Sequence, residues 1–158
     1  IQKLQLNKHP EGGYFKEVYR AGEMFFIDAP KKNLKRNVST SIFFLLDGAQ
    51  VSKFHRLKSD ELWHFYDGTS VKIHCIDERG KLTEIILGKK TENGEMFQVV
   101  IKKNTWFAAE VISKRSFALI GCTVSPGFDF SDFELADRKI LSKQFPKLID
   151  LIFKFTNP

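Results

Sequence analysis

The feature that most constrains this chain is a series of short runs, rich in β-branched and aromatic residues, between positions 39 and 123. Glycine-containing turn pairs such as Asp67-Gly68 and Asn93-Gly94 separate several of these runs. No helical period of useful length interrupts them, so the strands should be largely antiparallel and form a barrel or two packed sheets. The expected strands cover residues 39–46, 51–57, 61–66, 71–77, 81–87, 96–101, 105–111 and 116–123.

The segments on either side of this region predict further elements. The apolar residues between positions 1 and 6 predict the tail of a short helix that ends before Pro10, and a strand should follow over residues 14–20. Beyond Pro126 the apolar spacing changes and predicts two short helices that are split at Pro146. The expected fold is therefore an all-β jelly-roll barrel with a short N-terminal helix and short C-terminal helices.

The composition fits a single domain over residues 1–158, because 158 residues with 42% hydrophobic content can form one substantial core. The net charge of +6 raises the question of nucleic acid or an anionic membrane as partner. The densest basic cluster, Lys31, Lys32, Lys35 and Arg36, falls in an expected loop, and the other lysines are scattered as on a solvated surface. We expect neither partner.

The two cysteines, Cys75 and Cys122, each lie within an apolar strand-like run. Neither has a second cysteine at metal-ligand spacing, and two buried thiols do not form a disulfide framework. No stretch approaches the roughly 18 apolar residues of a membrane-spanning helix, and no signal-like pattern opens the sequence. A cytoplasmic protein is the simplest expectation.

The segment from residue 48 to residue 68 carries the chemistry. Its residues His55, Glu61 and Gly68 fall at the spacing of the first cupin signature, which this segment resembles, while Leu57 stands where that signature has a second histidine. Residues two apart on a strand share a face, so the signature directs its side chains into the barrel. Leu57 removes one metal ligand and makes the floor of the expected pocket apolar.

The residues at the remaining ligand positions of the cupin signatures also argue against a bound metal. The second cupin signature, proline-x-glycine-x-x-histidine, has Phe107 where its histidine would be. His55 and Glu61 then provide two ligands, fewer than the three of most catalytic zinc sites. His64 should face the opposite side of its strand from Glu61, which leaves His74 as the one remaining substitute. We expect neither a metal nor another cofactor.

Three blocks of sequence resemble one particular cupin family, cupin type five, also catalogued as a domain of unknown function. The chain departs from the family pattern at residues 101–104, where valine-proline-alanine-glycine is common. The resemblance implies a double-stranded β-helix, often a homodimer, with no firmly assigned reaction, among barrels that include epimerase-like and storage-like members. The blocks are residues 9–15 with Tyr19 and Arg20, residues 54–57 with 59–63, and residues 121–130 with 132–134.

Several side chains are candidates for contact with a ligand. His55 with Glu61 beside it can serve as a general base, or it can be a relic core histidine. The expected ligand-binding set also contains aromatic residues that are equally typical of plain core. Tyr14 or Tyr66 is the expected proton donor across the pocket, with Tyr14 preferred. The full expected binding set is His55, Leu57, Glu61, Trp63, Phe65, Trp106 and Phe107.

Two functions follow from this reading. The first is a binding module for a carbohydrate, nucleotide-sugar or nucleotide-like small molecule around His55 and Glu61. The alternative is a metal-independent sugar epimerase or isomerase with His55 as the general base, by analogy with cupin epimerases; an empty storage or scaffold barrel is a weaker option. Phe128, Phe130 and Phe133 add apolar surface beyond the needs of one barrel, so the expected partners are a small-molecule ligand and a second copy of the chain.

Overall fold

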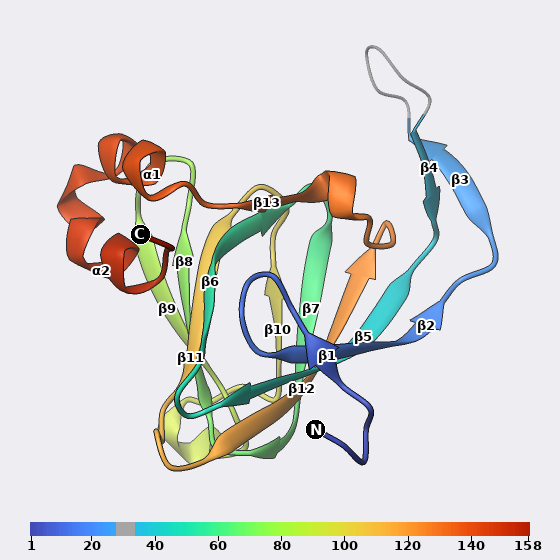
Figure 1. The fold of residues 1–158 in the computed structure, drawn as a ribbon, viewed down its shortest axis with the longest axis horizontal. Coiled ribbons are helices and arrows are strands. Elements are labelled where there is room, and N and C mark those ends of the chain that lie inside the picture. The colour runs from blue at the N-terminus through green and yellow to red at the C-terminus, as the bar shows by residue number, and fades with distance from the viewer. Residues whose placement is uncertain (28–33) are drawn as a thin grey trace.

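The structure is a computed structural model that describes residues 1–27 and 34–158. Two sheets face each other, one with strand order β1-β2-β5-β12-β7-β10 and the other with order β13-β6-β11-β8-β9 (Figure 1). Neighbouring strands within these sheets are antiparallel. The strands are β1 (Asn7–Lys8), β2 (Tyr14–Arg20), β3 (Met24–Ile27), β4 (Leu34–Asn37), β5 (Thr40–Asp47), β6 (Val51–Leu57), β7 (Asp60–Gly68), β8 (Val71–Ile76), β9 (Leu82–Leu87), β10 (Gln98–Ile101), β11 (Trp106–Val111), β12 (Phe117–Ser125) and β13 (Phe133–Leu135).

The expected strands are confirmed as β2 and β5 to β12, with ends that move by a few residues. Glycine adopts the expected left-handed conformation in three of the turns, at Gly68 (φ 96°), Gly80 (φ 78°) and Gly94 (φ 79°), but not at Gly48, where it was also expected. The sequence did not predict β1, β3, β4 or β13. These strands have two to four residues each, too few for an alternating pattern to be recognised.

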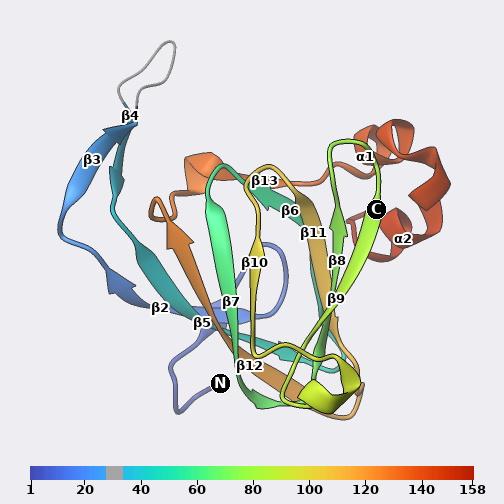
Figure 2. The ribbon, with the colours of Figure 1, turned by 180° about the vertical axis from the view of Figure 1, so that it is seen from behind.

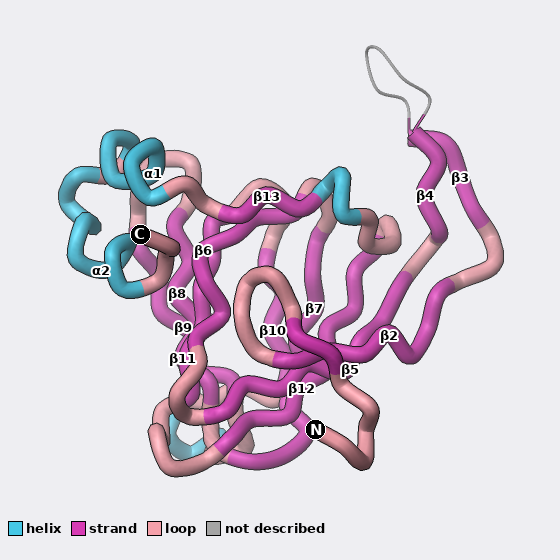
Figure 3. The backbone as a smooth tube through the Cα atoms, viewed as in Figure 1, coloured by secondary structure: helices cyan, strands magenta, loops and turns pink. Residues whose placement is uncertain are grey.

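The expected N-terminal helix is wrong. Residues 1–6 form turns, and β1 then pairs with the start of β2 (Figure 3). Gln5 has φ 54°, in the left-handed region that interrupts a right-handed helix. So short a segment before Pro10 also cannot offset the cost of starting a helix. Leu6 is buried and anchors this segment to the barrel.

The expected C-terminal helices are present as α1 (Arg138–Gln144) and α2 (Ile149–Lys154), with a 3-10 turn at Pro146–Leu148 between them. They cover the outer face of the five-stranded sheet (Figures 1 and 2), where their apolar side chains pack against strand residues that point away from the barrel interior. No helix among residues 1–27 and 34–158 has the length and apolar character needed to cross a bilayer. The cluster on this face contains Phe54, Ile76, Trp106, Ala108, Ala136, Leu141, Phe145, Ile152 and Phe155.

The barrel interior is filled by a second apolar cluster from both sheets. Trp63 and Phe44 lie at its centre with their ring centroids 6.0 Å apart, and Phe107 is also 6.0 Å from Trp63. All three side chains are essentially inaccessible to solvent. The interior is therefore closed at this depth, so any ligand site must lie nearer to one end of the barrel.

The pair β3 and β4 projects from the barrel beside the end of β2 (Figures 1 and 2). The basic cluster was expected in a loop. This prediction is wrong for its two described members, because Lys35 and Arg36 belong to β4. Arg36 is buried, with its Nε donating to Asp132 Oδ2 at 2.6 Å. That partner lies 96 positions further along the chain, beyond the reach of local sequence reasoning. Lys31 and Lys32 lie outside the described residues.

Candidate functional site

A cavity of about 290 Å³ lies at the end of the barrel next to the segment that follows β12. Its buried polar side chains are His9, Glu11, His55 and Glu61, while Glu17, Arg20 and Asp129 line it from exposed positions. The volume is near the lower end of the roughly 300–1,000 Å³ range of ligand pockets. The remaining lining residues are Phe15, Thr40, Ile42, Phe44, Leu57, Cys122, Val124, Phe128, Phe130 and Phe133.

Glu11 is the centre of the buried polar group. Its Oε1 accepts a hydrogen bond from the Ser52 hydroxyl at 2.8 Å, and its Oε2 lies 3.2 Å from His9 Nδ1 and 3.1 Å from His55 Nε2. Burial by itself would raise the pKa of Glu11, but His55, His9 and Ser52 together hold it below its ordinary value. Glu11 is therefore ionised at neutral pH and held in a fixed position.

A tight loop delivers this carboxylate to the cavity. Gly12 and Gly13 both have positive φ, at 112° and 71°, and a Cβ on Gly12 would come within 2.2 Å of the Val51 carbonyl oxygen. The loop is also fastened to β6, because the Lys53 N–H donates to the Glu11 carbonyl at 2.8 Å. Only glycine allows this close approach, so the Gly-Gly pair sets where Glu11 lies.

His55 on β6 lies between two acceptors. Its Nδ1 is 2.7 Å from the Lys53 carbonyl oxygen, and its Nε2 faces Glu11. The His55–Glu11 contact is a hydrogen bond only when one proton lies between Nε2 and Oε2, so the two side chains act as a single proton-sharing pair. Burial lowers the pKa of His55, against the opposing effect of the Glu11 charge.

Glu61 on β7 differs from Glu11, whose two carboxylate oxygens both have partners. The Glu61 carboxyl is buried, and Oε2 has no hydrogen-bond partner among the described residues. Burial, with a further contribution from the Glu11 charge, raises the pKa of Glu61 to about 8. At neutral pH this side chain is therefore a neutral carboxylic acid. Cys122 is close enough to feel the same charges, and burial followed by Glu61 and Glu11 raises the pKa of its thiol well above the ordinary value.

Aromatic rings form a wall of the cavity next to these polar groups. Phe128, Phe130 and Phe133 lie in the segment after β12 and pack edge to face, with the centroids of Phe128 and Phe130 5.0 Å apart. The imidazole of His9 joins them, 5.8 Å from Phe133 and 4.7 Å from Phe15. The buried polar groups and the aromatic rings of the cavity are thus in contact, since His55 also lies with its ring centroid 5.4 Å from that of Phe133.

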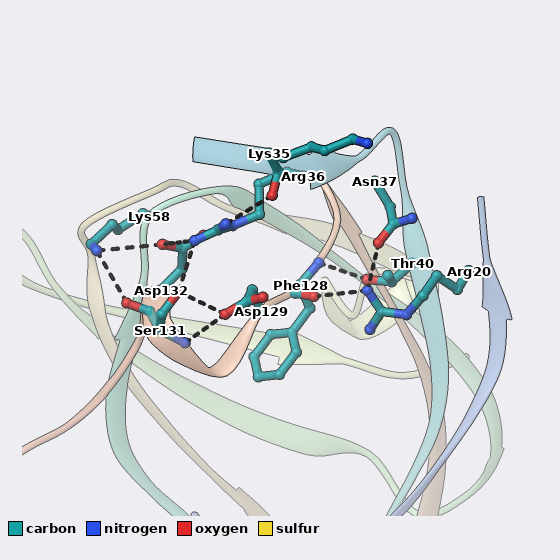
Figure 4. Close-up of polar contacts among 10 residues, drawn as sticks. All are labelled: Arg20, Lys35, Arg36, Asn37, Thr40, Lys58, Phe128, Asp129, Ser131 and Asp132. Atoms are coloured by element: carbon teal, nitrogen blue, oxygen red, sulfur yellow. Dashed lines mark hydrogen bonds and ion pairs between the residues drawn. The ribbon is translucent and has the colours of Figure 1, made fainter. Parts of the chain in front are cut away.

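Buried and half-buried polar contacts hold the aromatic segment in place (Figure 4). The Phe128 N–H donates to Thr40 Oγ1 at 2.8 Å, and Arg20 donates to the Phe128 carbonyl at 3.3 Å. Asp132 is bound by Arg36 from β4 and by Lys58. The aromatic wall is therefore attached to strands β2, β4 and β5 and to the turn after β6.

The cavity brings together three of the expected binding residues, His55, Leu57 and Glu61. The four expected aromatic residues do not line it. Trp63 and Phe107 belong to the closed interior below, and Phe65 packs against that same interior cluster. Trp106 faces outward, with the Arg56 guanidinium 4.5 Å above its ring. It is adjacent to Phe107 on one strand, so the two side chains point to opposite faces.

The two expected proton donors are also elsewhere. Tyr14 is half-buried on β2 and does not line the cavity. Tyr66 is half exposed, and its hydroxyl covers Gly121 so closely that a Cβ there would come within 2.2 Å of it. Arg56 and Asp60, which follow His55 and precede Glu61 in the sequence, form surface ion pairs with Glu134 and Lys102, at 2.7 Å and 2.8 Å respectively.

The donor set does not fit a cupin metal. Leu57 and Phe107 have no atom that can coordinate one, and His55 is occupied by Glu11. His74, the remaining substitute, is on the other face of the sheet, with Nδ1 3.0 Å from Glu84 and its ring against Phe155. Within the described part of the chain, no three His, Cys, Asp or Glu side chains are grouped to hold a metal ion. Both cysteines are free thiols.

The expected binding set did not include His9 or Glu11, although both fall within the first block of the family resemblance, next to the Gly-Gly pair. Phe128, Phe130 and Phe133 were expected as apolar surface beyond the needs of one barrel; all three line the cavity, and their contact with a second copy of the chain stays a prediction.

Two facing antiparallel sheets with a side-chain-lined cavity at one end define a cupin barrel. The family model described as Cupin superfamily (DUF985) matches residues 1–136, and the chain belongs to this family. An uncharacterized protein of Saccharomyces cerevisiae, YML079W, is 30% identical over 143 residues, which cover 84% of this chain and 71% of that protein.

Solved structures agree with this assignment. Protein SO0799 from Shewanella oneidensis is 37% identical with a TM-score of 0.91, over 100% of this chain and 95% of that one. A hypothetical protein from Leishmania major is 29% identical with a TM-score of 0.91, over 100% and 97% of the two chains. Oxalate decarboxylase from Bacillus subtilis shares the fold at 13% identity and a TM-score of 0.59, and this chain spans 36% of its length.

Proposed function

We propose that this protein binds a small organic molecule in the cavity around Glu11, His55 and Glu61. The observation that carries the proposal is the unpartnered Glu61 Oε2, which belongs to a buried side chain that lines the cavity. A buried polar group without a hydrogen bond costs about 1–3 kcal/mol. A ligand that supplies the missing hydrogen bond recovers that free energy, which gives it a specific anchor.

The size and chemistry of the cavity restrict the ligand. A volume of about 290 Å³ suits a molecule with one or two rings, such as a monosaccharide or a nucleobase. Its polar group would bind Glu11, His55 and Glu61, and its body would lie against the phenylalanine wall. Among the described residues, Arg20 is the one permanent cation that lines the cavity, and it is paired with Glu17, so the described lining offers a diphosphate such as that of a nucleotide sugar no free counter-charge.

A thermal-shift screen with neutral sugars, nucleosides, small amines and small acids tests this function. A ligand at 100 times its dissociation constant should add about 2.7 kcal/mol of stability. Replacing Glu61 with Gln should reduce that gain by about 0.5–1.5 kcal/mol, the range for a hydrogen bond to the neutral acid that Glu61 is at neutral pH. The matched control, Glu84→Gln on the opposite face of the sheet, should leave it unchanged. A ligand whose gain is equal in wild type and Glu61→Gln would contradict the site.

A second candidate function is metal-independent isomerisation of a sugar. It is favoured by two carboxyl groups of one cavity with opposite pKa shifts, since Glu61 titrates at about 8 and the pKa of Glu11 is lowered. The Glu11–His55 pair would remove a proton from the carbon next to a carbonyl, and Glu61 would donate its proton to the carbonyl oxygen. Glu61 takes the acid role that sequence reasoning gave to Tyr14.

Deuterium exchange distinguishes catalysis from binding. A reducing sugar incubated with the protein in heavy water should gain deuterium at the carbon next to its carbonyl, and both Glu11→Gln and Glu61→Gln should abolish the gain. Binding of the same sugar with no exchange above the protein-free rate would leave a binding protein and exclude the isomerase.

We also propose that the protein is a homodimer. The strands β2 and β3 expose large apolar side chains, with Tyr19 54% and Phe26 69% accessible, and Phe130 at the cavity is 57% accessible. Light scattering at micromolar concentration should then give about twice the chain mass of 18.3 kDa. A monomer at that concentration would contradict the proposal.

A further inference from the structure

The charges that line the cavity are unbalanced. Four of the lining residues carry carboxyl groups: Glu11, Glu17, Glu61 and Asp129. The one permanent cation among the lining residues, Arg20, donates to both oxygens of Glu17, at 2.9 Å and 2.6 Å. Asp129 lies near enough to Arg36 and Arg20 to feel their charges, whereas the buried Glu11 and Glu61 have no guanidinium or ammonium group beside them among the described residues. Such a cavity attracts positive charge and repels anions.

The aromatic lining has the same preference. Five phenylalanines contribute to the cavity wall, of which Phe128, Phe130 and Phe133 form one connected group. The faces of aromatic rings carry negative electrostatic potential, and a cation close to a ring face gains about 0.5–2 kcal/mol. Aromatic rings combined with carboxyl groups are the chemistry that recognises an ammonium group attached to an apolar body.

The unpartnered oxygen of Glu61 marks where the charged group would bind. This side chain is 7% exposed and lines the cavity, and its Oε2 has no hydrogen-bond partner among residues 1–27 and 34–158. By contrast, Glu11 already accepts from Ser52 and faces two imidazoles. The cavity therefore keeps one oxygen of a buried carboxyl available, although Trp63 and Cys122 lie close to that carboxyl, and holds a second carboxyl fully engaged.

We propose that the ligand of this cavity is a protonated amine on a small apolar or aromatic body, with its ammonium group bound to Glu61 and its body packed on Phe128, Phe130 and Phe133. The inference rests on the proposed small-molecule function and names the ligand class. An ammonium N–H donates to the free carboxyl oxygen and neutralises its charge once Glu61 ionises, whereas an ionised carboxylate has no hydrogen to donate and would add negative charge beside Glu11.

Binding of an amine should also release a proton. Glu61 has a pKa of about 8 in the empty protein, so at neutral pH it is largely protonated and must ionise to pair with an ammonium ion. The titratable groups that act on it are Glu11 from the loop before β2 and Cys122 from β12, with His55 of β6 bound to Glu11. Affinity for an amine should consequently rise with pH up to about 8.

Three probes of nearly equal size test the ligand class: benzylamine, benzyl alcohol and benzoate. Calorimetry near pH 7, in two buffers of different ionisation enthalpy, should show benzylamine binding about tenfold tighter than benzyl alcohol, with benzoate weakest. About one proton should be released per benzylamine bound and none with the alcohol. In Glu61→Gln the preference for the amine and the proton release should both disappear, whereas Glu84→Gln should behave as wild type.

The pH series on the unmodified protein keeps the test independent of how well Glu61→Gln folds. Benzylamine affinity should rise between about pH 6 and pH 8, while benzyl alcohol affinity stays constant. Equal or tighter binding of benzyl alcohol, or amine binding without proton release, would overturn the amine assignment and leave the small-molecule function intact. If no probe of any charge binds, and no compound of the wider screen shifts the melting temperature, both proposals fail together.

Discussion

His55 and His74 lie on opposite faces of the same five-stranded sheet, and the two faces use buried charge differently. Burial lowers the pKa of both histidines, and each lies beside a carboxylate. Behind His74 the space is closed by Phe155, whose ring centroid is 5.0 Å away. Beside His55 there is a cavity. Similar histidine and carboxylate pairs thus form part of a sealed core on one face and of an open site on the other.

The carboxyl groups make the contrast clearer. On the His74 face, burial would raise the pKa of Glu110, but hydrogen bonds from Lys114 and Lys154 outweigh it and lower that pKa to about 2. On the cavity side of the barrel, Glu61 belongs to β7 of the facing six-stranded sheet; burial raises its pKa to about 8, and among the described residues no lysine or arginine opposes the shift. The side of the five-stranded sheet that faces a buried acid without a counter-charge is therefore the side that can bind a ligand.

The largest expected effect separates stability from binding. Phe155 is fully buried against Phe54 and His74, so Phe155→Ala should lower the free energy of unfolding by about 3–5 kcal/mol. The half-buried Phe133 of the cavity wall serves as the matched variant, and Phe133→Ala should cost less stability but weaken ligand binding. Urea titrations and calorimetry of both variants measure this. Equal losses of stability would remove the distinction between the two faces.

The second effect is on the alkaline side of the stability profile. Because the folded pKa of Glu61 is about 8 and its ordinary value is 4.5, the folded state holds more protons than the unfolded state between these values. Stability should therefore fall as pH rises through this window, by at most about 1.4 kcal/mol per pH unit from this group. Glu61→Gln should flatten the decline in urea titrations from about pH 5 to pH 8. A decline that persists in the variant would assign it to another group.

The third effect, on the opposite face, has the opposite sign. The folded pKa of Glu110 is about 2 and its ordinary value is 4.5, so its contribution is complete above the ordinary value and is lost as pH falls toward 2. Lys114 and Lys154 are half exposed, so solvent screening limits this contribution to about 1 kcal/mol. Glu110→Gln should reduce the acid sensitivity of unfolding and leave the alkaline limb unchanged. If Glu110→Gln instead removed the fall in stability between about pH 5 and pH 8, the assignment of that fall to Glu61 would be wrong.

The smallest effect concerns a charge next to the site in sequence but outside it in space. Asp60 precedes Glu61, yet it pairs with Lys102, whose side chain is 74% exposed. Lys102→Ala should change stability by no more than about 0.5 kcal/mol and should leave ligand affinity unchanged. A clear loss of affinity would show that the site extends to the outer side of β7.

The sequence was sufficient to predict the barrel because alternation and glycine turns are local signals. It also predicted His55, Leu57 and Glu61 as cavity residues, since the signature spacing fixes their strands and faces. The sequence predicted less well how deep in the barrel a residue of a given strand lies. Trp63 shares a face with Glu61 but lies two residues deeper, in the closed interior.

The rest of the site depends on contacts between distant segments. Glu11 reaches the cavity through a loop whose path is set by Val51 and Lys53, about forty positions away in the chain. The phenylalanine wall is held by Arg36 of β4 through Asp132, which no local pattern records. The prediction of an N-terminal helix was wrong for a related reason, because a few apolar positions cannot distinguish a helical turn from a loop that is anchored by packing.

Because Gly12 and Gly13 approach strands β5 and β6 closely, substitutions of these two glycines have different consequences from substitutions at positions 9 and 11 beside them. A Cβ on Gly13 would lie 2.8 Å from the Leu45 carbonyl, so the loop path tolerates no larger residue there. Glu11 is bound through its side chain, through its backbone carbonyl and through its N–H, which donates to His9 Nδ1 at 3.4 Å. With the glycines kept, substitutions at positions 9 and 11 can therefore alter what the cavity recognises while every strand of the barrel keeps its sequence.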